Sequence, residues 1–173
     1  MEESTNLMDA ALYGQYVDEV TRLINEGEDV NGADSVGSTT LIYSVIGGNV
    51  KIIRLLIESG ANVISRDKNG WTALMYAVNN PKEKCDEIVE LLVNSGAEIN
   101  VRSKDGWSAP MLIARNLITS ARYINRQEIE EFMEFVGILT ILTGKEDFLP
   151  EDFLEIVKKV DKKYKLYKKR ELK

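Results

Sequence analysis

The sequence has no histidine, one cysteine (Cys85) and only three prolines in 173 residues. Without histidine, Ser–His and Cys–His activation of a nucleophile is excluded, together with the commonest general base. A single cysteine cannot form an internal disulfide, and one thiol without histidine provides none of the usual zinc ligand sets. We therefore predict a protein that is not an enzyme and that binds no metal or cofactor, with Cys85 as an ordinary, unreactive thiol.

Long apolar runs are also missing. The most apolar stretch, residues 135–144, is far shorter than the ~20 residues of a membrane-spanning helix. The N-terminal segment has no apolar run of signal-peptide length, and a lone cysteine fits a reducing compartment. We expect an intracellular protein without a transmembrane segment, cytoplasmic in the first place, with a nuclear location or export as an effector as alternatives.

Charge is unevenly distributed along the chain. The net charge is −6, but residues 158–173 contain nine basic residues and two acidic ones, which leaves −13 on residues 1–157. An acidic body argues against a general nucleic-acid-binding surface, so we expect no nucleic-acid partner. The basic tail is interpreted as a solvated chain end, with a nuclear-import or acidic-lipid patch as the alternative.

Glycines recur at a nearly fixed spacing. Gly27, Gly60 and Gly96 each follow an amphipathic run, and they are 33 and 36 residues apart. A second series opens the following units at the same spacings: Gly37, Gly70 and Gly106. Both series lengthen at the same place, which predicts a three-residue insertion within residues 79–87. A fixed period of this length indicates a repeat architecture.

Each unit has the same internal order. A hydroxyl residue (Thr39, Thr72 or Ser108) precedes an apolar helical run that it can cap. A second amphipathic helix follows and ends at a glycine, and an Asn-Gly or Asp-Gly turn leads into the next unit. Two short helices and a turn cannot bury both of their faces, so neighbouring units must stack to form the core.

These units resemble the ankyrin repeat. The resemblance lies in the segments 34–44 and 67–77, of the form D-x-x-G-x-T-x-L, and in the segments 52–63 and 88–100 that follow them. It is clearest over residues 33–107 and fades beyond Trp107, where Pro110 replaces the family leucine. The family's proline position holds Thr40, Ala73 and Ala109, and its histidine position holds Ile42, Met75 and Met111. We therefore expect apolar packing in place of the family's histidine hydrogen bonds.

The resemblance implies an all-α ankyrin-repeat solenoid of stacked helix-turn-helix units with short hairpin turns, followed by a C-terminal capping helix. The repeats are expected at residues 1–32, 33–65, 66–102 and 103–145, with the C-terminal helix and basic tail at 146–173. It further implies a monomeric, non-enzymatic module that binds another protein, of unknown identity, through the concave face formed by the turns and the first helices.

Carried onto this sequence, the expected partner-binding residues are Ser35, Val36, Ser38, Tyr43, Lys68, Asn69, Trp71, Tyr76, Asn79, Asn80, Lys104, Asp105 and Trp107. Further inner-helix positions are Ile46, Leu112 and Arg115. Trp71 and Trp107 occupy the same position in successive repeats. Tryptophan is a frequent binding hot spot, but these two could instead simply cover the hairpins.

Three further interpretations stay open. Residues 150–167 form an amphipathic pattern that is expected to cap the stack. The overlapping segment 148–160 resembles the start of an F-box, which implies an adaptor that recruits ubiquitin-ligase machinery; the basic tail could instead dock on a membrane or in the nucleus. Asn31 and Asn100 match the sequence context in which some ankyrin repeats are hydroxylated.

Overall fold

The computed structural model describes residues 6–14, 17–79 and 85–120. Within them the regular elements are helices: α1 (Leu7–Tyr13), α2 (Val17–Asn25), α3 (Thr40–Gly47), α4 (Val50–Glu58), α5 (Ala73–Asn79), α6 (Cys85–Asn94) and α7 (Ala109–Ser120). Extended structure in this part of the chain is limited to two isolated antiparallel bridges, Ala33–Thr39 and Arg66–Thr72. The expected all-helical fold is confirmed.

The chain divides into two compact units, Met1–Ala109 and Pro110–Lys173. Helices α1 to α6 belong to the first unit, which is described below. The expected boundary at residues 145–146, the capping helix and the F-box-like segment all lie outside the described residues.

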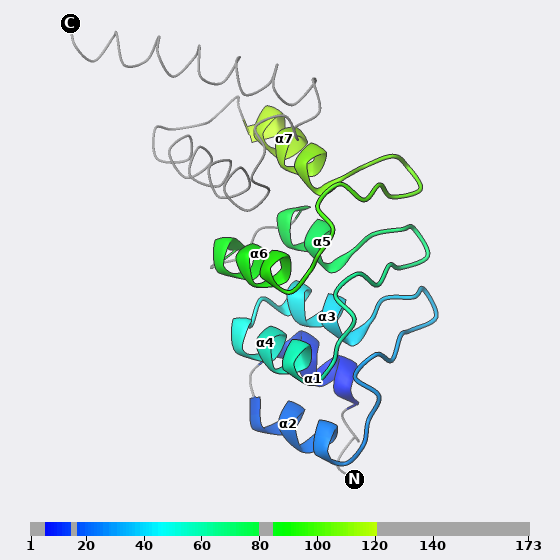
Figure 1. Cartoon of the computed structure of the whole chain (residues 1–173), viewed down its shortest axis with the longest axis vertical. Coiled ribbons are helices and arrows are strands. Elements are labelled where there is room, and N and C mark those ends of the chain that lie inside the picture. Colours follow the sequence, from blue (N-terminus) through cyan, green and yellow to red (C-terminus); the bar gives the residue numbers. More distant parts are fainter. Residues whose placement is uncertain (1–5, 15–16, 80–84, 121–173) are drawn as a thin grey trace, which may run out of the picture. The chain divides into compact units, whose positions relative to one another are not determined.

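The six helices of the first unit form two layers. In Figure 1, α1, α3 and α5 lie side by side next to the loops. Helices α2, α4 and α6 form the second layer, on the side that faces away from the loops. Helix α3 contacts α1, α4 and α5, whereas α4 contacts α2, α3 and α6. The middle pair, α3 and α4, therefore packs on the pair before it and the pair after it, as the repeat pattern predicts.

The helix ends follow the local sequence signals. Thr39 caps α3 by accepting a hydrogen bond from the amide of Ile42 (3.3 Å), and Thr72 does the same for Met75 (3.3 Å). At the other end of each pair, glycine takes the left-handed conformation that stops the second helix, with φ of 93°, 92° and 96° at Gly27, Gly60 and Gly96. Both signals were correctly predicted.

The core lies between the helix layers and between successive pairs. Its fully buried members in this unit include Val20, Leu41, Ile42, Ile52, Ile53, Leu56, Leu74, Met75, Ile88 and Leu92. Ile42 and Met75 stand where the family has histidine, so apolar packing does replace the histidine there, while Met111 is half-buried. Thr40, at the family's proline position, is completely buried, and its hydroxyl group has no hydrogen-bond partner.

Candidate partner-binding surface

Three hairpins project from one side of the helix stack (Figure 1) and share one backbone geometry. In each, the first residue's amide donates to the carbonyl four residues on: Asp34 to Ser38 (3.1 Å), Asp67 to Trp71 (3.0 Å) and Ser103 to Trp107 (2.8 Å). Successive hairpins are also joined to each other, because Lys68 N donates to Val36 O (2.9 Å) and Lys104 N donates to Asn69 O (2.8 Å). The hairpins therefore form a continuous, hydrogen-bonded row.

Side chains tie the first two hairpins to the inner helices. The Asp34 carboxylate accepts hydrogen bonds from the amides of Val36 (2.9 Å) and Ser38 (2.8 Å) with one oxygen, and from the Tyr43 hydroxyl (2.7 Å) with the other. One repeat later, Asp67 accepts from the amides of Asn69 and Trp71 (both 2.8 Å).

The Tyr76 hydroxyl completes the second set by donating to the other Asp67 oxygen (2.9 Å). Neither aspartate was among the residues predicted for this surface, although both hold its hairpins in place. A signal for them existed, because Asp–Tyr pairs nine residues apart recur at the 33-residue spacing.

These hydrogen bonds change the ionisation of the groups involved. The hydrogen bond from Tyr43, supported by backbone amides, lowers the pKa of Asp34. The same bond raises the pKa of Tyr43. For Tyr76, burial is the larger cause, followed by the hydrogen bond to Asp67, and together they raise its pKa to about 12. Both tyrosines are therefore neutral hydrogen-bond donors at physiological pH.

Trp71 lies against Tyr76, with ring centroids 5.2 Å apart and an angle of 54° between the rings. Such tilted aromatic pairs contribute beyond their buried area. Ser38 of the preceding hairpin, which is only 7% exposed, also forms a side-chain hydrogen bond with the Tyr76 hydroxyl. Tyr76 therefore joins two consecutive hairpins.

The expected partner-binding residues fall into three groups. Exposed in the structure are Ser35, Val36, Lys68, Asn69, Lys104 and Asp105. Half-buried are Tyr43, Ile46, Trp71, Tyr76, Asn79 and Trp107. Ser38 and Leu112 are buried, which leaves them little surface for a partner, while Asn80 and the side chain of Arg115 lie outside the described residues.

The two asparagines in the hydroxylation context are both exposed. Asn31 also has a structural role, because its amide group donates to Gly60 O (3.1 Å) and accepts from Asn62 N (2.7 Å). It thereby connects the end of the first repeat to the same point of the second. Hydroxylation of Asn31 and Asn100 remains a prediction.

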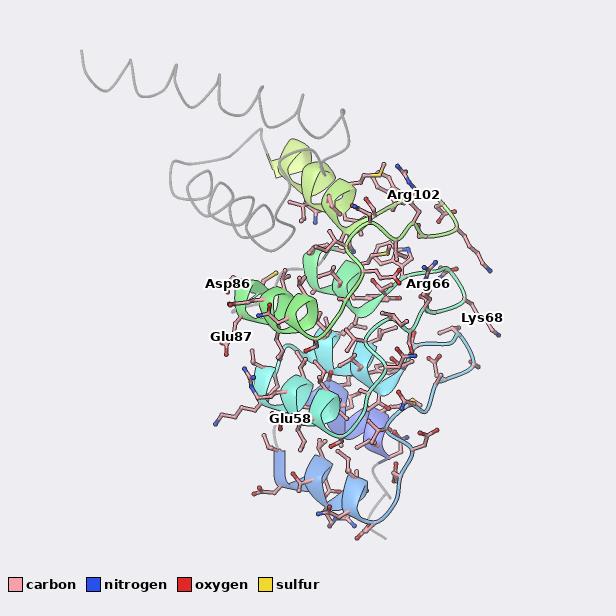
Figure 2. All side chains as sticks on the ribbon, in the orientation of Figure 1. Glu58, Arg66, Lys68, Asp86, Glu87 and Arg102 are labelled. Atoms are coloured by element: carbon pink, nitrogen blue, oxygen red, sulfur yellow. The ribbon has the colours of Figure 1, made fainter. Side chains whose placement is uncertain are left out.

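Several exposed charged residues lie on two different sides of this unit. Figure 2 shows Arg66, Lys68 and Arg102 on the side of the hairpins, and Asp86 and Glu87 on the opposite side, at the start of α6. Arg66 forms a long ion pair with Glu98 (3.8 Å) and Arg102 donates to Gly106 O (3.0 Å). The second and third hairpins thus carry basic residues that the first hairpin lacks.

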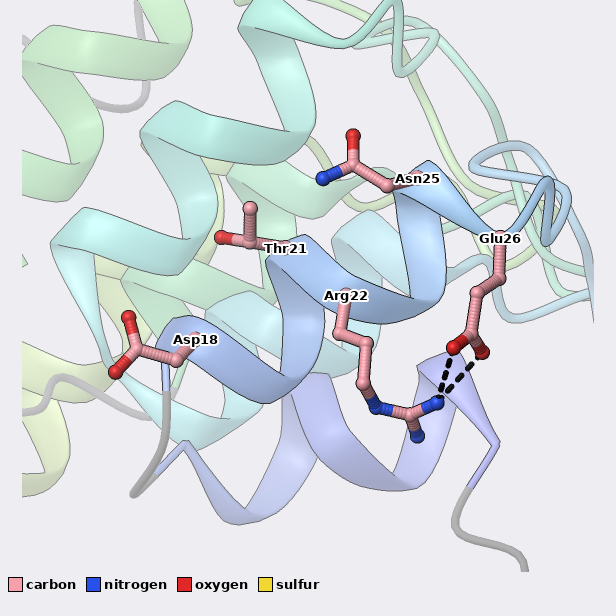
Figure 3. A pocket seen from close by; sticks show the side chains of 5 residues that line it. All are labelled: Asp18, Thr21, Arg22, Asn25 and Glu26. Carbon is pink, nitrogen blue, oxygen red and sulfur yellow. Dashed lines mark hydrogen bonds and ion pairs between the residues drawn. The ribbon is translucent and has the colours of Figure 1, made fainter.

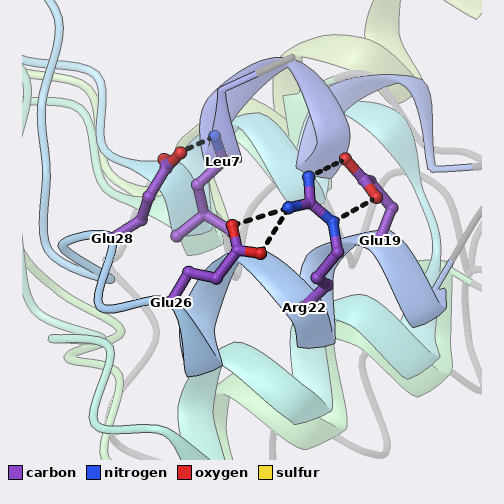
Figure 4. A network of polar contacts seen from close by, with 5 residues as sticks. All are labelled: Leu7, Glu19, Arg22, Glu26 and Glu28. Atoms are coloured by element: carbon purple, nitrogen blue, oxygen red, sulfur yellow. Dashed lines mark hydrogen bonds and ion pairs between the residues drawn. The ribbon is translucent and has the colours of Figure 1, made fainter. Parts of the chain in front are cut away.

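The outer face of α2 carries a second group of polar side chains. Its exposed side forms a shallow hollow lined by Asp18, Thr21, Arg22, Asn25 and Glu26 (Figure 3). Arg22 binds Glu19 (2.8 Å) and Glu26 (2.6 Å), so its charge is already neutralised (Figure 4). The pKa of Glu19 is lowered by its hydrogen bond to Arg22.

Glu28 accepts a hydrogen bond from the amide of Leu7 (2.9 Å) at the start of α1 (Figure 4). This end of the stack therefore presents polar groups that already have partners.

Cys85 begins α6, and its thiol lies 3.4 Å from the carbonyl oxygen of Ala77. Burial, with the nearby Asp86 charge, raises the pKa of the Cys85 thiol to about 11, which disfavours the reactive thiolate. Among the residues that the structure describes, no three His, Cys, Asp or Glu side chains are grouped so that they could hold a metal ion. Within the same residues, no helix is both long and apolar enough to span a bilayer.

The comparisons with known proteins agree with the repeats described above. The family model for ankyrin repeats, in three copies, matches residues 7–103. This match covers more than half of the chain, and the chain therefore belongs to the ankyrin-repeat family. It includes the first helix pair, α1 and α2, and it stops at the third hairpin. No curated protein matches the chain.

Proposed function

We propose that this protein binds a partner protein through the hairpin surface, which we define as Ser35, Val36, Tyr43, Lys68, Asn69, Trp71, Tyr76, Asn79, Lys104, Asp105 and Trp107. Ankyrin repeats in general are protein-interaction modules, and their fold is non-catalytic. The specific surface, the absence of enzymatic activity and an intracellular location are our proposals for this chain.

The observation that carries the proposal is the Trp71–Tyr76 pair beside Lys68 and Asn69. Both rings are half-buried, so each is held in place yet keeps accessible area. Asp67 accepts hydrogen bonds from the Tyr76 hydroxyl and from the Trp71 amide, so it holds both the tyrosine ring and the hairpin that carries Trp71. Binding hot spots are typically aromatic anchors of limited freedom surrounded by polar residues. A surface fixed before binding also loses less conformational entropy on association.

A paired substitution tests this assignment. The intact protein would be used to capture its partner from a lysate of its native cells, and the affinity for that partner would then be measured. We expect Trp71→Ala combined with Trp107→Ala to weaken binding about thirtyfold or more, which corresponds to ~2 kcal/mol.

The matched control lies on the outer layer, where Lys51 and Glu58 are exposed on α4. Lys51→Ala combined with Glu58→Ala should leave the affinity within a factor of two. Unchanged affinity in the tryptophan variant would contradict the proposed surface. Lost affinity together with a collapsed melting transition would show instead that the two tryptophans mainly support the fold.

A further inference from the structure

Resting on the proposed function, we propose that the hairpin surface binds an extended, acidic segment of its partner, whose carboxylates pair with Lys68 and Lys104. These two lysines occupy the same position in the second and third hairpins. Both are exposed, and Figure 2 shows Lys68 directed away from the helices at the hairpin side of the molecule. The first hairpin has Ser35 at this position, so the basic pair is confined to one stretch of the row.

Neither lysine is used to neutralise the protein's own acidic groups. Among the described residues, the ion pairs are formed by Arg22 and Arg66, not by Lys68 or Lys104. Lys51 and Arg54 on α4 are exposed and outside these ion pairs as well, so what distinguishes Lys68 and Lys104 is their equivalent position on two adjacent hairpins. A carboxylate from a partner would supply the missing counter-charge.

The hairpin backbones fix the relative position of the two lysines. Lys104 N donates a hydrogen bond to Asn69 O, one residue from Lys68. Lys68 N in turn donates a hydrogen bond to Val36 O. The hairpins pack so closely that a Cβ atom on Gly70 would lie 3.2 Å from Lys104 N and from the Cα of Ser103. Gly70 also has a φ of 79°, which disfavours any other residue. The lysine backbones are therefore set at a constant separation before a partner binds.

This separation suits an extended chain. Packed helices lie ~8–10 Å apart, and equivalent positions in adjacent hairpins should be separated by a similar distance. An extended peptide advances ~3.3 Å per residue, so acidic residues three positions apart would reach both lysines. Val36, which is exposed at the tip of the first hairpin, and the half-buried Trp71 offer apolar contact beside the charged positions.

The charge distribution also favours binding of an acidic segment at the hairpins. Asp86 and Glu87 are exposed at the start of α6, on the side of the second layer that faces away from the hairpins (Figure 2). Their field repels an acidic partner from the start of α6, while Lys68 and Lys104 attract it to the hairpins. A long polyanion such as nucleic acid would extend beyond the two lysines onto the acidic body, which favours a short acidic protein segment.

Fluorescence anisotropy with defined probes tests the proposal. The probe is a fluorescein-labelled Glu-Ser-Gly repeat peptide, compared with the corresponding Gln-Ser-Gly and Lys-Ser-Gly peptides and with oligothymidine of equal charge. We expect the glutamate peptide to bind at least tenfold more tightly than the other three. We also expect its affinity to decrease as salt is added.

Two charge-matched variants show where the peptide binds. Lys68→Glu combined with Lys104→Glu should weaken the glutamate peptide at least tenfold. Lys51→Glu combined with Arg54→Glu makes the same change of net charge on exposed positions of α4 and should have less than a twofold effect. Equal losses in both variants, or equal binding of the glutamate and glutamine peptides, would overturn the proposal. Tighter binding of oligothymidine would overturn it in favour of a nucleic-acid surface.

The outcome is separable from the test of the proposed function. If the captured partner needs Trp71 and Trp107 but is insensitive to Lys68→Glu with Lys104→Glu, the hairpin surface stands and its acidic ligand is refuted. If the glutamate peptide binds at the lysines but the tryptophan variant keeps full partner affinity, the acidic site stands and the aromatic anchor is refuted.

Discussion

The first two hairpins and the third have the same backbone but different side-chain supports. Asp34 and Asp67 each hold two amides of their own hairpin and one tyrosine of the following helix. In the third hairpin Ser103 takes the aspartate position, and its hydroxyl accepts a single hydrogen bond, from Trp107 N (3.1 Å). Nine residues on, where the other units have tyrosine, the sequence has Leu112.

This difference shows that the hairpin path and its attachment to the helices are separate properties. The turn follows from backbone hydrogen bonds and from a glycine with positive φ, which all three hairpins share. The attachment needs a carboxylate with two accepting oxygens and a tyrosine placed to reach it. The third hairpin keeps the turn without this attachment, at the point where the family match also ends.

The largest effect is expected from Asp67→Ala. Asp67 is only 6% exposed and is the acceptor for Asn69 N, Trp71 N and the Tyr76 hydroxyl. Removing it leaves three donors without this partner, each partly shielded from water. We expect the free energy of unfolding to decrease by about 3 kcal/mol, measured by urea denaturation.

Two further variants are controls for this loss. Asp67→Ser recreates the third hairpin's chemistry and should be milder than Asp67→Ala, because a hydroxyl can still accept from one amide. Ser103→Ala should lower stability by only about 1 kcal/mol, since a single hydrogen bond is lost. If Ser103→Ala were as damaging as Asp67→Ala, the proposed difference between the hairpins would be wrong.

A smaller effect is expected from removing the tyrosine hydroxyls. Tyr76→Phe deletes the bond to Asp67 but keeps the ring against Trp71, so we expect a loss of about 1 kcal/mol. Tyr43→Phe should have a smaller effect. Burial is the largest cause of the raised pKa at Tyr76 but not at Tyr43, so the Tyr76 hydroxyl is the more shielded from water. A thermal melt of both single variants and of their combination checks this order, and a stabilising effect of either would contradict it.

Alkaline pH should weaken the first two hairpins selectively. The pKa of Tyr76 is raised to about 12 in the folded protein, above its ordinary value of about 10. Folding therefore favours the neutral form of Tyr76. The stability that this hydroxyl contributes is fully present below pH ~10 and is lost as the pH rises towards 12. Ultraviolet titration of tyrosinate, compared between the protein and Tyr76→Phe, should show one late-titrating group missing from the variant. The same titration of both proteins in denaturant should place that group near pH 10.

The smallest expected change concerns the helix that follows each hairpin. Thr40 at the start of α3 is fully buried with an unpartnered hydroxyl, while Ala73 takes the same position in α5. Thr40→Val keeps the shape and removes the unpaired polar group, so stability should increase by up to about 1 kcal/mol. Ala73→Val, the matched change in the next repeat, should not stabilise, because it adds volume to a packed position. A lower melting temperature for Thr40→Val would indicate that the hydroxyl has a partner after all.

The architecture of this protein was largely predictable from local signals in its sequence. Hydroxyl caps at Thr39 and Thr72, glycines at the helix ends and apolar spacing within each helix all act over a few residues, so they are visible without a structure. Their repetition at 33 and 36 residues then implied the stacking of one unit on the next. The exposed hairpin positions Lys68, Asn69 and Lys104 followed from the same register.

Only the tertiary structure decided which of those positions are available to a partner and which are used for support. Ser38 is buried and hydrogen-bonded to Tyr76 of the next repeat, and the side-chain amide of Asn31 is hydrogen-bonded to Gly60 and Asn62. These contacts depend on how closely the helix pairs approach and how the side chains turn. Both are set by packing between repeats, which the residues of a single repeat do not specify.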